Sequence, residues 1–210
     1  MPKLQPPFHL FLGDSRPSCI SEYGAGGAVT QHMDMPSQTD IIPNGELHYE
    51  EYQAIFHEEA WKDIVLSKNV WGEFIWCMFD FASYSREEGD TKGQNDKGLV
   101  TRDRKVKKDA YYFYQSIWGD KKMVHITSSR YQTRPYYVPE IKVYSNAETV
   151  EVFVDGKSAG VRSAKKEEWG ATIFTWENIE LLQDKENTVK AIAVFCDGSQ
   201  KEDCVTWIGR

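Results

Sequence analysis

Glu22 is a carboxylate in an unusual setting, the segment ISEYGAGG at residues 20–27. This stretch is too glycine-rich for a helix interior, and it suits the end of a buried strand, where the backbone turns sharply and a side chain faces a cavity. A carboxylate held there can act as a nucleophile or as an acid–base group. A glutamate that only caps a neighbouring amide fits the same local sequence.

Further side chains with chemical potential follow along the chain. Asn95 and Lys97 form Asn-x-Lys-Gly in the loop QNDKGLV, where an amide and an ammonium can neutralise and orient a carboxylate, although a solvated charged loop is the alternative. His32, in VTQHMD, either touches a ligand or is solvated. Trp76 either lines a site or packs in the core. We interpret Asp80, an acid in an apolar run, as a strand terminus rather than as an anchor for neighbouring groups.

Length and charge restrict the class of protein. The chain has 210 residues, a hydrophobic fraction of 40% and a formal charge of −7, which describes a globular protein and argues against a nucleic-acid partner. No apolar run approaches the roughly 20 residues of a membrane helix. Residues 1–18 form only a weak secretory signal, and we predict no signal peptide in this chain, so the compartment stays open.

The four cysteines are Cys19, Cys77, Cys196 and Cys204, and they show no CxxC or Cys/His pattern. We therefore predict no metal site. Cys196 and Cys204 flank DGSQKED and would face each other across a hairpin if they were bonded. We favour two reduced thiols on strands.

The first half of the chain alternates strand-like and helix-like patterns. A short strand around residues 18–24 precedes a helix at 48–68, in which Tyr52, Ile55, Phe56, Ala60 and Ile64 form an apolar face opposite the acids. The run at 71–82 is apolar on both alternating faces, which predicts a central strand that is covered on both sides. A closing helix follows the basic run at 101–108, which we interpret as a solvated helix entry.

Long loops after the strands are typical of (β/α)8 barrels, which place their sites at the carboxyl ends of parallel strands. A whole barrel needs ~200 residues or more, and far fewer precede the second half of the chain. We therefore predict that residues 1–120 are the C-terminal part of such a barrel, with two of its βα units. Such a piece leaves an apolar face uncovered.

The second half reads as short alternating strands at 140–146, 149–157, 171–181, 187–199 and 203–209. The pairs Asp155–Gly156 and Asp197–Gly198 are hairpin turn signals. We predict an immunoglobulin-like β-sandwich over residues 121–210, with the boundary near Gly119–Asp120. The predicted fold class is α/β plus all-β.

Four segments in this order, SEYGAGG, WGEFIWCMFDFA, NDKGLVTRDRKVKKDAYYFYQSIW and IKVYSNAETVEVFVDGK, resemble family 2 glycoside hydrolases, and most of all their β-galactosidase-like members. The resemblance covers residues 19–210. It implies that Glu22 is the nucleophile of a retaining hydrolysis, that Tyr23 keeps the Glu22 carboxylate ionised by a hydrogen bond, and that the small neighbours leave room for a sugar ring. It also implies that Trp76 and His32 contact the substrate.

The family's acid–base glutamate belongs to an Asn–Glu dipeptide, and no Asn–Glu dipeptide occurs in these 210 residues. Because general acid help is typically worth ~10²–10⁴-fold, we expect this chain alone to be essentially inactive. We predict no cofactor. The expected partners are a carbohydrate and either the remaining part of the enzyme or a second copy.

Two questions of function stay open from the sequence. The Asn95–Lys97 motif is similar to the one that grips a sugar carboxylate in β-glucuronidases, but we place a β-galactoside first and a β-uronide second. The other class of function is a non-catalytic carbohydrate-binding or structural module, in which Trp169, Trp176 and Trp207 would be stacking platforms unless they are core residues.

Overall fold

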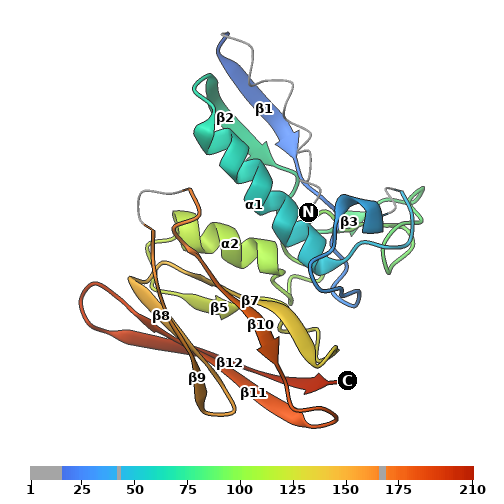
Figure 1. Ribbon diagram of the computed structural model, residues 1–210. Helices are drawn as coiled ribbons and strands as arrows, with labels where there is room; N and C mark the ends of the chain where they lie inside the picture. Colours follow the sequence, from blue (N-terminus) through green and yellow to red (C-terminus); the bar gives the residue numbers. More distant parts are fainter. Residues whose placement is uncertain (1–15, 42–43, 166–168) are drawn as a thin grey trace. The chain divides into compact units, whose positions relative to one another are not determined.

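Two compact units make up the computed structural model, which describes residues 16–41, 44–165 and 169–210 (Figure 1). Unit 1 ends at Tyr111 and unit 2 begins at Tyr112. We predicted the boundary at Gly119–Asp120. The two units divide inside helix α2 (Asp109–Trp118), where the Tyr112 ring stacks on His125 of the same unit with 3.7 Å between centroids. The segment that we read as a weak secretory signal lies almost wholly outside the described residues.

Unit 1 has the predicted order of strand, helix and strand. Strand β1 (Ser18–Tyr23) is followed by α1 (Glu50–Leu66) and by β2 (Val70–Ile75), and β1 pairs with β2 in parallel. The smaller elements are the 3-10 helix η1 (Gln38–Asp40) and the two-residue strands β3 (Phe81–Ala82) and β4 (Gln94–Asn95). No helix in the described part of the chain is long and apolar enough to cross a membrane.

Strand β2 exposes large apolar side chains. The exposed fractions of Trp71 and Phe74 are 72% and 62%. The prediction that this run is covered on both faces was therefore wrong for the chain described here. The apolar face that we expected to stay uncovered is present. Whether β1 and β2 belong to a barrel stays a prediction, because two parallel strands do not define one.

Helix α1 buries part of its predicted apolar face. Tyr52, Ala60 and Ile64 are buried, whereas Ile55 and Phe56 are half-buried.

The expectation that the acids occupy the opposite, solvated face of α1 was wrong for Glu50, Glu51 and Glu58, which are buried. The reason is visible for Glu50, whose Oε1 accepts a hydrogen bond from the backbone N–H of Asp109 at 2.9 Å. A buried carboxylate is tolerated where such donors replace water. The apolar periodicity carries no information about those donors.

Unit 2 consists of two sheets. One has the order β10-β7-β5 and the other the order β6-β12-β11-β8-β9, and all pairs are antiparallel except β6 with β12. The strands are β5 (Val124–Ile126), β6 (Thr133–Arg134), β7 (Tyr137–Ser145), β8 (Thr149–Val154), β9 (Lys157–Ser163), β10 (Ile173–Glu180), β11 (Glu186–Val194) and β12 (Gln200–Gly209). The chain is thus mainly β with few helices.

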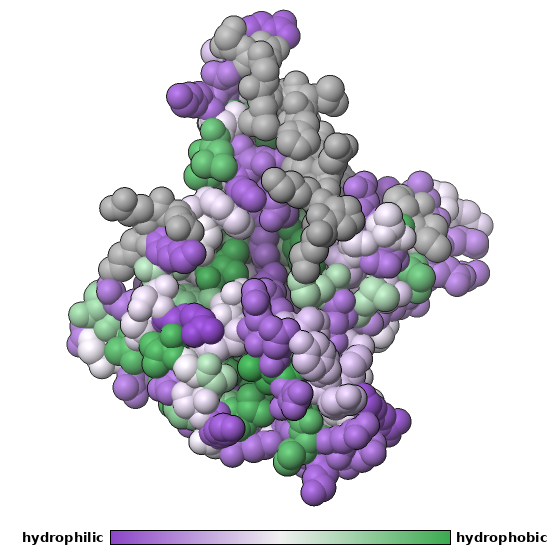
Figure 2. Space-filling view, viewed as in Figure 1, coloured by the Kyte–Doolittle hydropathy of each residue, from purple (hydrophilic) through white to green (hydrophobic). Residues whose placement is uncertain are grey.

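One apolar core lies between the two sheets of unit 2. Its members come from both sheets and include Ile141 of β7, Val152 of β8 and Trp176 of β10. Trp176 and Trp207 are each 1% exposed. They are core residues, so they cannot be the stacking platforms that the carbohydrate-binding alternative required. On the face shown in Figure 2, hydrophobic residues over this unit form small groups among hydrophilic ones.

Both predicted hairpin turns of unit 2 are present. Asp155 and Gly156 have φ angles of 48° and 78°, as a two-residue turn between β8 and β9 requires. In the β11–β12 hairpin, Cys204 lies opposite Lys190, and Cys196 follows the end of β11. All four cysteines are free. We predicted that Cys196 and Cys204 lie on strands; Cys204 does, but Cys196 lies in the turn.

Candidate active site

The segments that carry the predicted site residues lie side by side in unit 1. The Trp76 N–H donates to the Tyr23 carbonyl at 2.7 Å, and the Cys77 N–H donates to the Lys97 carbonyl at 3.1 Å. These bonds join the C-terminal ends of β1 and β2 to the Asn-x-Lys-Gly loop. Residues far apart in sequence therefore gather at one edge, next to Glu22, where parallel strands end.

Glu22 itself is exposed, whereas Tyr23 is buried. The Tyr23 ring lies against His57, with 5.8 Å between the ring centroids. The expected hydrogen bond from the Tyr23 phenol to the Glu22 carboxylate stays a prediction. The buried Tyr23 ring packs the end of β1 against helix α1, and the neighbouring Glu22 is exposed.

The glycines after Glu22 make room for neighbouring protein groups. A Cβ atom at Gly24 would lie 2.0 Å from the Trp76 carbonyl oxygen, and one at Gly26 would lie 2.3 Å from Nδ1 of His48. Either contact is impossible without displacement. We expected small residues there to leave space for a sugar ring, but the structure gives another reason: the loop packs directly against the end of β2 and a buried histidine.

The Asn-x-Lys-Gly loop is internally braced. Asn95 is buried, and its Oδ1 accepts a hydrogen bond from the Lys97 N–H at 3.0 Å. Asn95 therefore shapes the loop in addition to any role in binding.

The Lys97 ammonium lies among charged groups of both signs. Its Nζ is 3.8 Å from Oε1 of Glu88, a buried carboxylate that also pairs with Arg86. The charge of Lys97 also acts on the Asp96 carboxylate. Because the Lys97 side chain is only partly buried, its ammonium can reach an anionic ligand.

Trp76 and His32 differ in their availability. Trp76 is 42% exposed, and its ring packs at a right angle against Phe81, so part of the indole is accessible. Both ring nitrogens of His32 face protein acceptors, with Nδ1 2.9 Å from Glu51 Oε1 and Nε2 3.1 Å from the Val29 carbonyl oxygen. These contacts favour a structural role for His32, and none of them supports its predicted contact with substrate.

Asp80 is an anchor, which corrects our reading of it as a plain strand terminus. Its Oδ1 accepts hydrogen bonds from the Gly98 N–H at 2.8 Å and from Lys108 Nζ at 2.9 Å. Lys108 also donates to the Asp96 carbonyl at 2.8 Å. Burial raises the pKa of Asp80 above its usual value, against the lowering effect of Lys108. This ion pair holds the Asn-x-Lys-Gly loop from beneath.

A second buried pair lies beside the first. His48 Nδ1 is 2.7 Å from Asp96 Oδ2. Burial acts to raise the pKa of Asp96, but the hydrogen bond and charge of His48, together with Lys108 and Lys97, outweigh burial and hold that pKa below its usual value. Asp96 therefore stays ionised under the loop.

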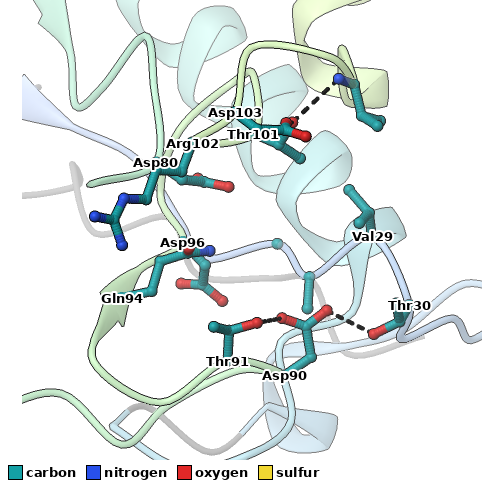
Figure 3. A pocket seen from close by; sticks show the side chains of 13 residues that line it. Val29, Thr30, Asp80, Asp90, Thr91, Gln94, Asp96, Thr101, Arg102 and Asp103 are labelled. Atoms are coloured by element: carbon teal, nitrogen blue, oxygen red, sulfur yellow. Dashed lines mark hydrogen bonds between the residues drawn. The ribbon is translucent and has the colours of Figure 1, made fainter. Parts of the chain in front are cut away.

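A cavity of about 610 Å³ opens on the other side of this loop (Figure 3). Gln94 and Asp96 line it, whereas Asn95 and Lys97, at the alternate positions, do not. Further lining comes from Asp80, Asp90, Asp103 and Arg102. Within the described residues no group of three His, Cys, Asp or Glu side chains is arranged to hold a metal ion. Glu22 is not among the residues that line this cavity.

Sequence reasoning missed the residues that hold the site together. Gln53 and His48 fell outside the apolar pattern of the helix, and Glu88 was one acid in a charged loop. The basic run is exposed as predicted, apart from its last residue, Lys108. A signal existed only for Asp80, a charge within an apolar run, and we gave it the wrong weight.

Comparisons with known proteins show which proteins this chain resembles. Residues 138–199 match a family model described as a domain of unknown function, DUF4982. A β-glucuronidase of Bacteroides fragilis is 40% identical over 174 residues, which are 81% of this chain and 24% of that protein. Its relatives are glycoside hydrolases.

Two solved structures agree with this result. The FMN-binding β-glucuronidase of Faecalibacterium prausnitzii L2-6 is 35% identical with a TM-score of 0.76, over 91% of this chain and 27% of that chain. A putative β-galactosidase of Bacteroides fragilis is 28% identical with a TM-score of 0.79, over 90% and 27%. The chain thus spans about a quarter of the length of these glycosidases, and the comparisons do not distinguish the two sugars.

Proposed function

We propose that this chain is the part of a family 2 retaining β-glycosidase that supplies the nucleophile, Glu22. The observation that carries the proposal is the pair of backbone hydrogen bonds that place the ends of β1 and β2 beside the Asn-x-Lys-Gly loop. Glu22, Trp76 and Lys97 then surround one position where a sugar would lie. In this proposal residues 16–111 belong to a barrel and residues 112–210 to an accessory sandwich.

The proposed reaction is a double displacement that needs two carboxyl groups, of which this chain supplies one. The Glu22 carboxylate attacks the anomeric carbon, and the bond to the leaving oxygen breaks as a general acid protonates that oxygen. Water then cleaves the glycosyl–Glu22 bond, helped by the same group as a base. That acid–base glutamate would come from outside these 210 residues, since the Asn–Glu dipeptide is absent.

We now place a β-glucuronide before a β-galactoside as the substrate, which reverses the order that we drew from the sequence. The support is the partly buried ammonium of Lys97, which suits a sugar carboxylate. The name of the relative from Bacteroides fragilis agrees with this order. A galactoside remains the second candidate because one structural neighbour is named a putative β-galactosidase.

The word FMN in the name of one neighbour does not carry over to the cavity of unit 1. Asp80, Asp90, Asp96 and Asp103 line that cavity, and these carboxylates would repel the phosphate of FMN. We therefore assign no step to a flavin.

A chimeric enzyme tests the proposal. Residues 19–210 replace the matching segment of the Bacteroides fragilis β-glucuronidase, and hydrolysis of aryl β-glucuronides and aryl β-galactosides is measured. We expect turnover with a preference for the glucuronide. Glu22→Gln should lower kcat by roughly 10³-fold or more, as expected for a lost nucleophile. Lys97→Met should abolish the preference.

The matched control is Glu46→Gln, an exposed glutamate of the same unit, which should leave both rates unchanged. Retained activity in Glu22→Gln would remove the nucleophile assignment. A chimera that prefers the galactoside would restore the order that we drew from the sequence.

A further inference from the structure

Gln53 connects the two loops that carry the proposed site. It lies in α1 and is fully buried. Its Nε2 donates to the Ala25 carbonyl at 2.9 Å and to the Gly98 carbonyl at 3.2 Å. Ala25 follows Glu22 by three residues, and Gly98 directly follows Lys97. One amide group therefore holds both loops at once.

The oxygen of the same amide group lowers the stability of the fold. Gln53 Oε1 is buried and has no hydrogen-bond partner within the described residues. A buried acceptor without a partner lowers stability, so packing alone does not account for a glutamine at this position. The neighbouring loop is closely fitted to the side chain, because a Cβ atom at Gly27 would lie 2.8 Å from Gln53. The residue is placed for its two donors and not for packing alone.

We propose that Gln53 is a positioning residue that sets the spacing between Glu22 and Lys97. This inference rests on the proposed function. The spacing matters most for a substrate that meets both groups, with its anomeric carbon at Glu22 and its carboxylate at Lys97. A galactoside has no carboxylate and depends less on it. The bond from the Gly27 N–H to the Asp96 carbonyl, at 3.2 Å, is a second tie between the loops, so loss of Gln53 should loosen the spacing without abolishing it.

Hydrogen exchange on the full 210-residue chain tests the coupling without any activity. Gln53→Met keeps the volume and removes both donors. We expect backbone amides at 24–28 and at 96–99 to exchange about tenfold faster, and in both loops together. The control is Ile64→Ala, a buried residue of the same helix that touches neither bond, which should not produce this paired response. Unchanged exchange in either loop, or the same response in the control, would overturn the inference.

The chimeric enzyme tests the consequence for specificity. Gln53→Met should lower the ratio of glucuronide to galactoside kcat/KM about tenfold, because a small misplacement of a positioned substrate is expensive. Ile64→Ala should leave this ratio unchanged.

In a double-mutant cycle, Gln53→Met should lower the ratio no further once Lys97→Met is present. Additive losses would mean that Gln53 does not act through Lys97, which would overturn the inference. An inactive parent chimera counts against the proposed function alone, and the exchange experiment then decides the role of Gln53.

Discussion

Unit 2 is organised around apolar side chains, whereas unit 1 buries charged and amide groups beneath its loops. In unit 2 the core joins residues of both sheets, such as Ile141 and Val152. In unit 1 the corresponding positions include Gln53, Asp80 and Lys108. Hydrophobic burial suffices to define a sandwich. A loop that must hold its shape at a strand end needs directional bonds, and the polar interior of unit 1 supplies them.

The surfaces of the two units also differ, and here unit 1 is the more apolar along β2. Unit 1 exposes Trp71, Phe74 and Trp76 along and just after β2. In unit 2, Trp176 and Trp207 lie inside, whereas Trp118 is 51% exposed. An apolar residue on the surface and a polar one inside is an arrangement that lowers stability in isolation. Unit 1 is therefore expected to be the less stable and the more sensitive to changes of charge.

The largest expected effect comes from Lys108→Met. It leaves the Asp80 carboxylate buried without its cation, which should destabilise unit 1 by about 3–5 kcal/mol. Unit 2 should keep its stability. Urea unfolding followed by hydrogen exchange, read separately for peptides of each unit, measures the difference.

Two controls sharpen this prediction. Lys105→Met removes an exposed lysine whose partner, Asp103, is also exposed, and its effect on the free energy of unfolding should be far smaller. Asp80→Asn combined with Lys108→Met removes both charges and should recover part of the loss. An equal loss in the single and the double variant would show that the charge of Asp80 is not the cause.

Acid should weaken unit 1 through His57. Burial, with a further contribution from Lys108, lowers the pKa of His57 to about 3. The unfolded chain binds a proton at this histidine below about pH 6.5, while the folded chain does not until about pH 3. The free energy of unfolding should therefore fall by up to about 1.4 kcal/mol per pH unit as pH drops through this window.

Between about pH 6 and pH 5, carboxylates near their ordinary pKa values do not yet titrate, so the slope there reports mainly on histidines. The chain has five histidines, and comparison with a His57 variant is what singles out His57. His57→Gln should flatten the slope of stability against pH in that range, as measured by urea unfolding at each pH. A slope that persists in the variant would assign the acid sensitivity to another group.

The same contrast explains what could be predicted from the sequence. The strands of unit 2 and its turns at Asp155–Gly156 and Asp197–Gly198 followed from alternation and turn residues, which report burial and local backbone geometry directly. So did the order of β1, α1 and β2. Periodicity could not predict how far the side chains of β2 are exposed, because that depends on which segments pack against the strand.

The polar interior of unit 1 was harder to predict for a physical reason. Lys108 looks like any lysine of a basic run, and Gln53 looks like a solvated helix residue. Their burial depends on partners, Asp80 in one case and two carbonyl groups in the other, that lie far away in sequence. The residue types of the site were visible in the sequence, but the groups that position them were not.

The smallest expected effect is that of Phe74→Ala. Phe74 is 62% exposed on β2, so its truncation should change the free energy of unfolding by under about 1 kcal/mol. The matched change is Phe174→Ala in β10, where the ring is buried and its loss should cost about 3–5 kcal/mol. Because Phe74 belongs to an exposed apolar face, its removal should also reduce self-association, measured by sedimentation. If both variants lost the same stability, Phe74 would have to be buried in solution. The difference between the surfaces of the two units would then be refuted, but the difference between their interiors would not be affected.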